Sequence, residues 1–115
     1  MTETGPSLGR MLKRADFLAA NKAKRFATPG FVLLRRDRAD GDDTIRLGIT
    51  VTKKVGNAVI RNRIKRRFRE LARASLPLLG TPGADYVMIG RAGGIERDFQ
   101  ALAADLERAV RRLDQ

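Results

Sequence analysis

The segment Lys53–Glu70, with the sequence KKVGNAVIRNRIKRRFRE, decides how this chain folds and which surface it presents. It follows a strand-like pattern, opens with a turn and continues as a helix. Four apolar residues recur there at helical spacing: Ile60, Ile64, Phe68 and Leu71. Nine Lys or Arg residues lie between Lys53 and Arg73, against a single acid, Glu70. A helix with so much charge of one sign repels itself, and RNA or DNA is the usual partner that neutralises it.

The composition of the whole chain agrees with a nucleic-acid-binding protein. Its 115 residues suit one domain, and 24 basic against 13 acidic residues give a net charge of +11. The chain has no Cys and no His, which excludes disulfides and the usual transition-metal ligand sets and removes the commonest general base. We therefore expect no metal site of these kinds and no acid–base catalysis by His in the protein itself.

The sequence carries no signal for a membrane. No apolar run approaches the roughly 20 residues that span a bilayer. The first residues, Met1–Gly5, lack the basic start and apolar centre of a signal peptide. We therefore expect a cytoplasmic protein without membrane association.

The hydrophobic pattern predicts an α+β protein with a single RNA-binding domain at 10–115, preceded by a flexible segment at 1–9. The expected elements are a helix at 10–21, a short edge strand at 24–27, strands at 31–36 and 45–53, a helix from its N-cap Asn57 to about Ser75, a strand at 85–91 and a helix at 96–113. This α-β-β-β-α-β-α order, with a split β-α-β unit, predicts a two-layer sandwich containing a mixed four-stranded sheet.

Alternation along 45–53 predicts two different faces of the sheet. Ile45, Leu47, Ile49 and Val51 should pack inside, whereas Arg46, Gly48, Thr50 and Thr52 should form a small, polar and cationic face suited to RNA. The first helix should turn an apolar side inward that is made by Met11, Ala15, Leu18 and Ala19, and Asp16 falls on its polar side. The only tyrosine, Tyr86, is expected in or near the core.

The basic run closely resembles the signature of the bacterial ribonuclease P protein subunit. Arg61-Asn62-Arg63 is similar to the RNR motif of that family, with Lys53-Lys54 before it and Lys65 and Arg66 after it. The resemblance extends over most of the chain and includes Arg14–Phe17, Phe31–Leu33, Leu47–Thr52 and Asp85–Ile89.

The resemblance implies a protein without an active site. Catalysis would belong to a partner RNA, which uses Mg²⁺ to cut precursor tRNA at its mature 5′ end. The protein would bind this catalytic RNA, one protein per RNA, and the single-stranded 5′ leader of the precursor. The family also implies a left-handed crossover between the parallel strands, against a strong general rule.

The resemblance assigns two groups of residues. The residues expected to contact the catalytic RNA are Lys53, Arg61, Asn62, Arg63, Lys65, Arg66 and Arg69. The residues expected to bind the leader, in a groove between the first helix and the open sheet face, are Phe17, Val32, Thr50, Thr52, Lys54 and Asn62. Phe17 fits the core as well as the groove. Asn21 and Leu34 stand where aromatic side chains often line the groove in relatives.

Two other functions compete with this reading. An autonomous nuclease would need clustered carboxylates for metal ions or a pair of His residues, and the acids are scattered along the sequence. A ribosomal or architectural RNA-binding protein would have the same composition, so only the basic run argues against it.

Overall fold

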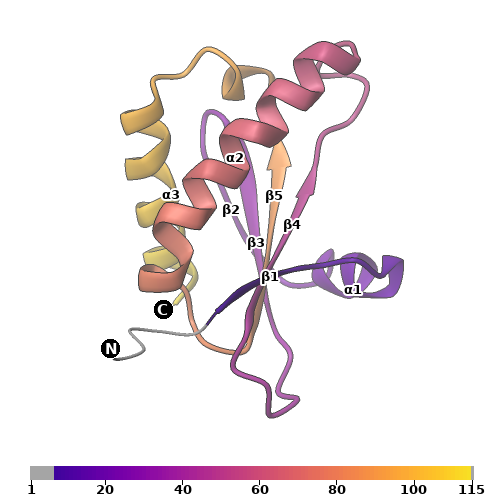
Figure 1. Cartoon of the computed structure of the whole chain (residues 1–115), viewed down its shortest axis with the longest axis vertical. Coiled ribbons are helices and arrows are strands. Elements are labelled where there is room, and N and C mark those ends of the chain that lie inside the picture. Colours follow the sequence, from indigo (N-terminus) through magenta and orange to yellow (C-terminus); the bar gives the residue numbers. More distant parts are fainter. Residues whose placement is uncertain (1–6, 115) are drawn as a thin grey trace.

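The computed structural model describes residues 7–114 and shows a mixed sheet with helices on both of its faces (Figure 1). Its elements are β1 (Leu8–Arg10), α1 (Arg14–Ala20), β2 (Lys24–Ala27), β3 (Phe31–Asp37), β4 (Ile45–Thr50), α2 (Ala58–Leu79), β5 (Ala84–Gly90), the short 3-10 helix η1 (Ala92–Gly94) and α3 (Phe99–Leu113). The predicted α+β class is confirmed.

Among residues 7–114 the sheet has five strands, in the order β1-β4-β5-β3-β2, one more than predicted. The additional strand β1 lies at the end of the segment expected to be flexible and runs parallel to β4. The Ile45 amide donates to the Ser7 carbonyl at 3.0 Å, and the Met11 amide donates to the Leu47 carbonyl at 2.9 Å. The sequence did not predict β1, because a strand of three residues that is held by backbone hydrogen bonds is too short to show a hydrophobic pattern. Residues 1–6 lie outside the described residues.

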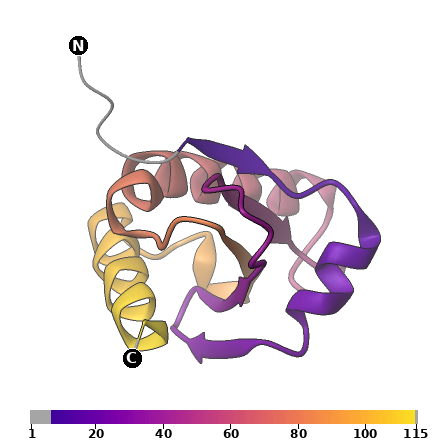
Figure 2. The ribbon, with the colours of Figure 1, turned by 90° about the horizontal axis from the view of Figure 1, so that it is seen from below.

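The unit formed by β4, α2 and β5 is a direct crossover and not a split one. β4 and β5 are parallel neighbours, with Leu47 beside Tyr86, so no strand separates them. In Figure 1 both strands point upward, α2 crosses in front and β5 lies to the left of β4; Figure 2 shows α1 on the opposite side of the sheet. This geometry makes the crossover left-handed, a rare arrangement that the family resemblance implied and periodicity could not.

Helix α2 begins where predicted and ends later. The Asn57 side chain caps it by accepting a hydrogen bond from the Ile60 amide at 3.0 Å. The helix continues past Ser75 to Leu79 and contains Pro77 in its last turn. Proline there removes only the bond to the carbonyl of the exposed Arg73, four residues earlier. The last turn is retained because Leu76 is fully buried.

The main core lies between the sheet and the helices α2 and α3. Ile64, Phe68 and Leu71 are buried as the spacing predicted, and the Phe68 ring packs edge-on against Phe31 with centroids 5.6 Å apart. Tyr86 is fully buried, as expected, and its hydroxyl oxygen accepts a hydrogen bond from the Thr81 amide at 3.0 Å. The position of α2 on the sheet is therefore fixed by apolar packing.

Helix α1 lies on the opposite face of the sheet, and its predicted phase was wrong. It is shorter than expected, and its inner side is formed by Asp16, Phe17 and Ala20, whereas Ala15 and Leu18 are exposed. The hydrophobic spacing of α1 predicted that Asp16 would face solvent. This spacing contains no information about arginines on the sheet, and these arginines pair with Asp16. The predicted inward alternation of β4 is confirmed, with Ile45, Leu47 and Ile49 on the side of the main core.

The ends of two further elements differ from the predicted ones. β4 stops at Thr50 and not at Lys53, because residues 53–55 form a turn. α3 begins at Phe99 and not at residue 96, and the Asp98 side chain caps it by accepting from the Ala101 amide at 3.2 Å. Phe99, predicted on the inner face, is 39% exposed in this first turn.

Replacing Ile64 by Asp should prevent folding. A carboxylate at this fully buried position costs several kcal/mol (about 5 or more), comparable to the whole stability of a small domain. Circular dichroism and thermal unfolding would show loss of the cooperative transition. The matched control is Val59→Asp on the same helix, which should fold because Val59 is 65% exposed. A folded, cooperative Ile64→Asp protein would contradict the α2 packing.

Candidate RNA interface

The basic run occupies the turn after β4 and the exposed sides of α2. Lys53 and Lys54 are exposed in the turn, which the Val55 amide closes by donating to the Thr52 carbonyl at 3.1 Å. The cap at Asn57 then starts the helix within a few residues. A hydrogen-bonded turn and a capped helix start therefore join the two lysines to the RNR segment.

The residues predicted to contact the catalytic RNA lie around the solvent side of α2. Asn62, Arg63, Arg66 and Arg69 are exposed, and Arg61 and Lys65 are half-buried. Within residues 7–114 none of these arginines and lysines forms an ion pair with an acid, whereas Arg61 Nε is buried without a hydrogen-bond partner there. We call Arg61, Arg63, Lys65, Arg66 and Arg69, together with Lys53, the α2 cationic surface. Its charge is uncompensated within the described part of the protein.

The ion pairs formed within residues 7–114 lie away from α2. Asp85 pairs with Arg46 and Arg38, with distances of 2.7 and 2.9 Å. Asp105 pairs with Arg97, and Glu107 pairs with Arg111 on α3. The cations of α2 are therefore left without acid partners by the way the ion pairs are distributed.

One arginine of the basic run, Arg67, has a structural role. Its guanidinium donates to the carbonyl of Gly94 at 3.0 Å and also to the carbonyls of Ile95 and Arg97. These carbonyls belong to the connection between β5 and α3. Arg67 therefore links α2 to that connection, and its guanidinium N–H groups are hydrogen-bonded to backbone carbonyls of the protein.

The face of the sheet that carries α1 contains an open row of side chains across three strands. Val32 on β3 lies beside Ile89 on β5, and Ile89 lies beside Thr50 on β4. All three are partly exposed. The structure thus brings together Val32 and Thr50, both predicted leader-binding residues, and inserts Ile89, which the sequence reading missed. The strand pairing would have placed Ile89 between Val32 and Thr50, but strand pairing cannot be read from a single sequence.

The next row of the same face is covered by α1. Leu34, Val87 and Gly48 lie side by side, and Leu34 and Val87 are buried. The Phe17 ring packs on Gly48 so closely that a Cβ at residue 48 would lie 2.6 Å from a ring carbon. Phe17 is half-buried, so it belongs to the small core under α1 and also borders the open row. Leu34, buried here, offers no surface to a base, and Asn21 is exposed at the end of α1.

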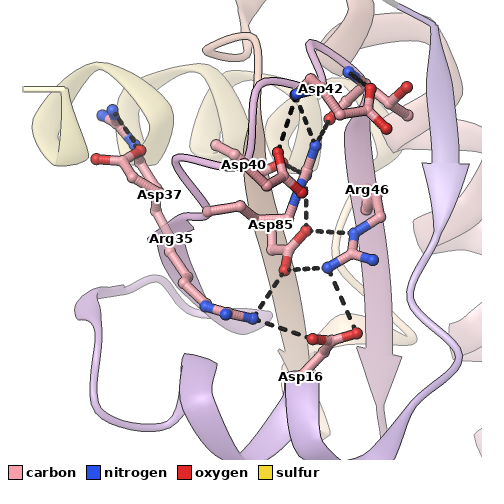
Figure 3. A network of polar contacts seen from close by, with 11 residues as sticks. Asp16, Arg35, Asp37, Asp40, Asp42, Arg46 and Asp85 are labelled. Carbon is pink, nitrogen blue, oxygen red and sulfur yellow. Dashed lines mark hydrogen bonds and ion pairs between the residues drawn. The ribbon is translucent and has the colours of Figure 1, made fainter.

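A third row, at the far end of this face, is ionic. Asp85, fully buried on β5, accepts two hydrogen bonds from Arg46, at 2.7 and 2.8 Å, and one from Arg38 at 2.9 Å (Figure 3). Arg36 and Arg46 also reach Asp16 on α1, at 3.2 and 3.4 Å. We call Asp16, Arg36, Arg38, Arg46 and Asp85 the arginine–aspartate network. The hydrogen bonds to Asp85 raise the pKa of Arg46 above its usual value, and Arg46, expected to face RNA, is engaged within the protein.

A cavity of about 400 Å³ separates α1 from α2 beside the edge of β4. Phe17 and Met11 line it on one side, and Lys65, Arg69 and Arg73 line it on the α2 side. It therefore brings Phe17, predicted for the leader, close to two residues predicted for the catalytic RNA. The remaining leader candidates, Thr52, Lys54 and Asn62, are all exposed and lie beyond the end of β4, with Asn62 on α2.

Two features are absent from residues 7–114. No cluster of three or more acidic side chains there could hold a metal ion. None of the described helices is long and apolar enough to cross a membrane.

Comparison with known proteins identifies the family. The model of the family described as Ribonuclease P matches residues 6–114. The chain belongs to the ribonuclease P protein family. It is 58% identical over 101 residues to the ribonuclease P protein component of Erythrobacter litoralis, covering 87% of this chain and 81% of the relative.

Solved structures of ribonuclease P proteins have the same fold. The protein from Thermotoga maritima matches with a TM-score of 0.76 and 34% identity, over 90% of this chain and 96% of that one. The protein from Staphylococcus aureus matches with a TM-score of 0.74 and 32% identity, over 90% and 93% of the two chains. The predicted family and fold are thereby confirmed.

Replacing Arg67 by Ala should destabilise the protein without removing an RNA contact. Each hydrogen bond from a charged donor contributes roughly 1.5–3 kcal/mol, and Arg67 makes three of them, so the free energy of unfolding should fall by at least about 1.5 kcal/mol. Urea denaturation would measure it. Arg66→Ala, one position away and exposed, should change stability by no more than about 0.5 kcal/mol. Equal stabilities of the two variants would contradict the structural role of Arg67.

Proposed function

We propose that this chain is the protein subunit of the ribonuclease P ribonucleoprotein, which binds the catalytic RNA and the 5′ leader of precursor tRNA. The observation that carries the proposal is the α2 cationic surface, which has no acid partner among residues 7–114. Such a surface stabilises a complex with a polyanion, because binding releases condensed counterions and relieves repulsion between the cations. Family membership supports ribonuclease P RNA as that polyanion.

The α2 cationic surface suits the catalytic RNA. Arg63, Arg66 and Arg69 are exposed on a rigid helix, and each planar guanidinium can donate two hydrogen bonds to a phosphate or stack on a base. Lys53 extends the same charge to the turn before α2. A rigid helix loses little conformational entropy when these side chains meet a folded RNA.

The sheet face beside α1 suits the single-stranded leader. The open row of Val32, Ile89 and Thr50 offers an apolar and hydroxyl surface to unstacked bases, and Phe17 borders it. Lys54 and Asn62, past the end of β4, supply a cation and an amide for the backbone. A groove of this composition binds a flexible strand without demanding one sequence.

The cleavage chemistry is assigned to the RNA. The buried acids, Asp85 and Asp105, accept hydrogen bonds from arginines, so they are occupied within the fold. The Mg²⁺ ions that activate water would be held by the catalytic RNA. The protein contributes affinity and orientation of the substrate.

The experiment that tests this function is cleavage of a precursor tRNA at low Mg²⁺ by protein alone, by bacterial ribonuclease P RNA alone and by the mixture. We expect correct 5′ maturation only with the mixture. Cleavage by the protein alone would support an autonomous nuclease. No stimulation of the RNA would support a ribosomal or architectural RNA-binding protein.

Removing single cations from α2 should reduce the salt dependence of assembly. Arg63→Ala and Arg66→Ala should each weaken binding to ribonuclease P RNA and lower the slope of log K against log [salt] by about one, since each removes one phosphate contact. Filter binding over a salt series would measure the slope. Arg111→Ala, which removes an equal charge from α3 where Arg111 pairs with Glu107, is the control and should keep the slope. An unchanged slope for both α2 variants would exclude them from the interface.

A further inference from the structure

Helix α1 is too short to hold its own position. It has seven residues, and the residue before it, Lys13, provides no side-chain cap. Isolated helices of this length are unstable in water, so contacts with the rest of the protein must keep α1 formed and in place. The proposed leader groove would depend on those contacts, because α1 would form one of its walls.

Two anchors connect the inner side of α1 to the sheet. The first is apolar, with Phe17 packed on Gly48 and Ala20 fully buried. The second is ionic, with Asp16 accepting from Arg36 at 3.2 Å and pairing with Arg46 at 3.4 Å. Asp16 directly precedes Phe17, so the ionic anchor also sets where the Phe17 ring lies.

The sheet side of the ionic anchor is fixed independently of α1. Asp85 is fully buried and holds Arg46 through two hydrogen bonds and Arg36 through a longer contact of 3.4 Å. Arg38, only 4% exposed, completes this cluster. Two arginines are thus presented to Asp16 at fixed positions, and removing Asp16 would leave them paired with Asp85 (Figure 3).

We propose that Asp16 is a positioning residue, whose ion pairs with Arg36 and Arg46 hold α1 over the sheet and thereby set the wall of the leader groove. This inference rests on the proposed binding of the leader. Asp16 itself touches no RNA in this scheme. It acts through Phe17, which stays between the covered row and the open row only while α1 keeps its place.

The proposal predicts the opposite sign from simple electrostatics. Removing an acid near a bound polyanion should strengthen binding, because repulsion falls and two arginines lose a counter-charge. Loss of positioning should weaken binding, because the groove then has to be ordered when the leader enters it. The direction of the effect therefore separates the two explanations.

The experiment compares holoenzymes assembled with wild-type protein and with Asp16→Ala. The dissociation constant of each holoenzyme is measured for precursor tRNA with a long leader and with a single-nucleotide leader. The constant for the single-nucleotide leader divided by the constant for the long leader gives the leader-dependent affinity. We expect Asp16→Ala to reduce this ratio by roughly two- to fivefold, the effect of about one ion pair. Affinity for the catalytic RNA should stay within about twofold of wild type.

The matched control is Asp37→Ala. Asp37 pairs with Arg35 at 3.0 Å at the end of β3, is exposed, and makes none of the contacts that hold α1. It removes the same charge and should leave the ratio unchanged or raise it slightly. Gly48→Ala is a second variant without any change of charge, since its Cβ would push against Phe17. It should reduce the ratio in the same direction as Asp16→Ala.

Each result decides between the explanations. An unchanged or raised ratio for Asp16→Ala overturns the positioning role, as does an equal loss of affinity for both substrates or for the catalytic RNA. A wild-type holoenzyme that binds both substrates equally would instead refute the proposed binding of the leader. Hydrogen exchange on the free Asp16→Ala protein provides an independent readout. Faster exchange confined to α1 supports the proposal, and unchanged exchange contradicts it.

Discussion

Burial of one apolar stripe of α2 against the sheet determines the rest of this molecule. Because Ile64, Phe68 and Leu71 must face β4 and β5, the remaining sides of the helix are turned to solvent. Those sides carry the arginines and lysines, which repel one another at the spacing of a helix. Apolar packing therefore stabilises an arrangement of charge that electrostatics alone would oppose. The same packing presents the cations as a preformed surface, which is what the proposed contact with RNA would require.

The acids complete this separation of charge. Arg38 and Arg46 lie within hydrogen-bonding distance of Asp85, and Arg97 lies within that distance of Asp105, whereas the α2 cationic surface has no such partner in the described residues. Arginine consequently has two roles in this chain: some arginines pair with acids inside the fold, and others form the α2 cationic surface. Arg67 shows that even neighbours in the basic run differ, since its fork binds the carbonyls of the β5–α3 connection. Net charge alone could not have distinguished these roles.

The sequence predicted the parts of the fold that local physics determines. Periodicity located the buried stripe of α2, cap chemistry located Asn57, and the run of basic residues located the exposed cations of α2. The sequence did not predict the features that depend on contacts between residues far apart in the chain. β1 is held by backbone pairing with β4, Asp16 is turned inward by arginines of two other strands, and Pro77 is retained because Leu76 is buried. Ile89 entered the candidate groove only through its neighbours in the sheet.

The composition of the groove has a consequence for how a leader would be recognised. Stacking on an aromatic side chain contributes roughly 1–3 kcal/mol per base. Here Leu34 is buried under α1, and the open row is formed by Val32, Ile89 and Thr50. Phe17 is thus the aromatic ring that borders this row, and its place depends on the short helix that carries it. With little stacking surface in the row, recognition of a leader would rely on the shape of the groove and on the charge of the leader's backbone. The position of α1 would then matter more than the identity of the bases.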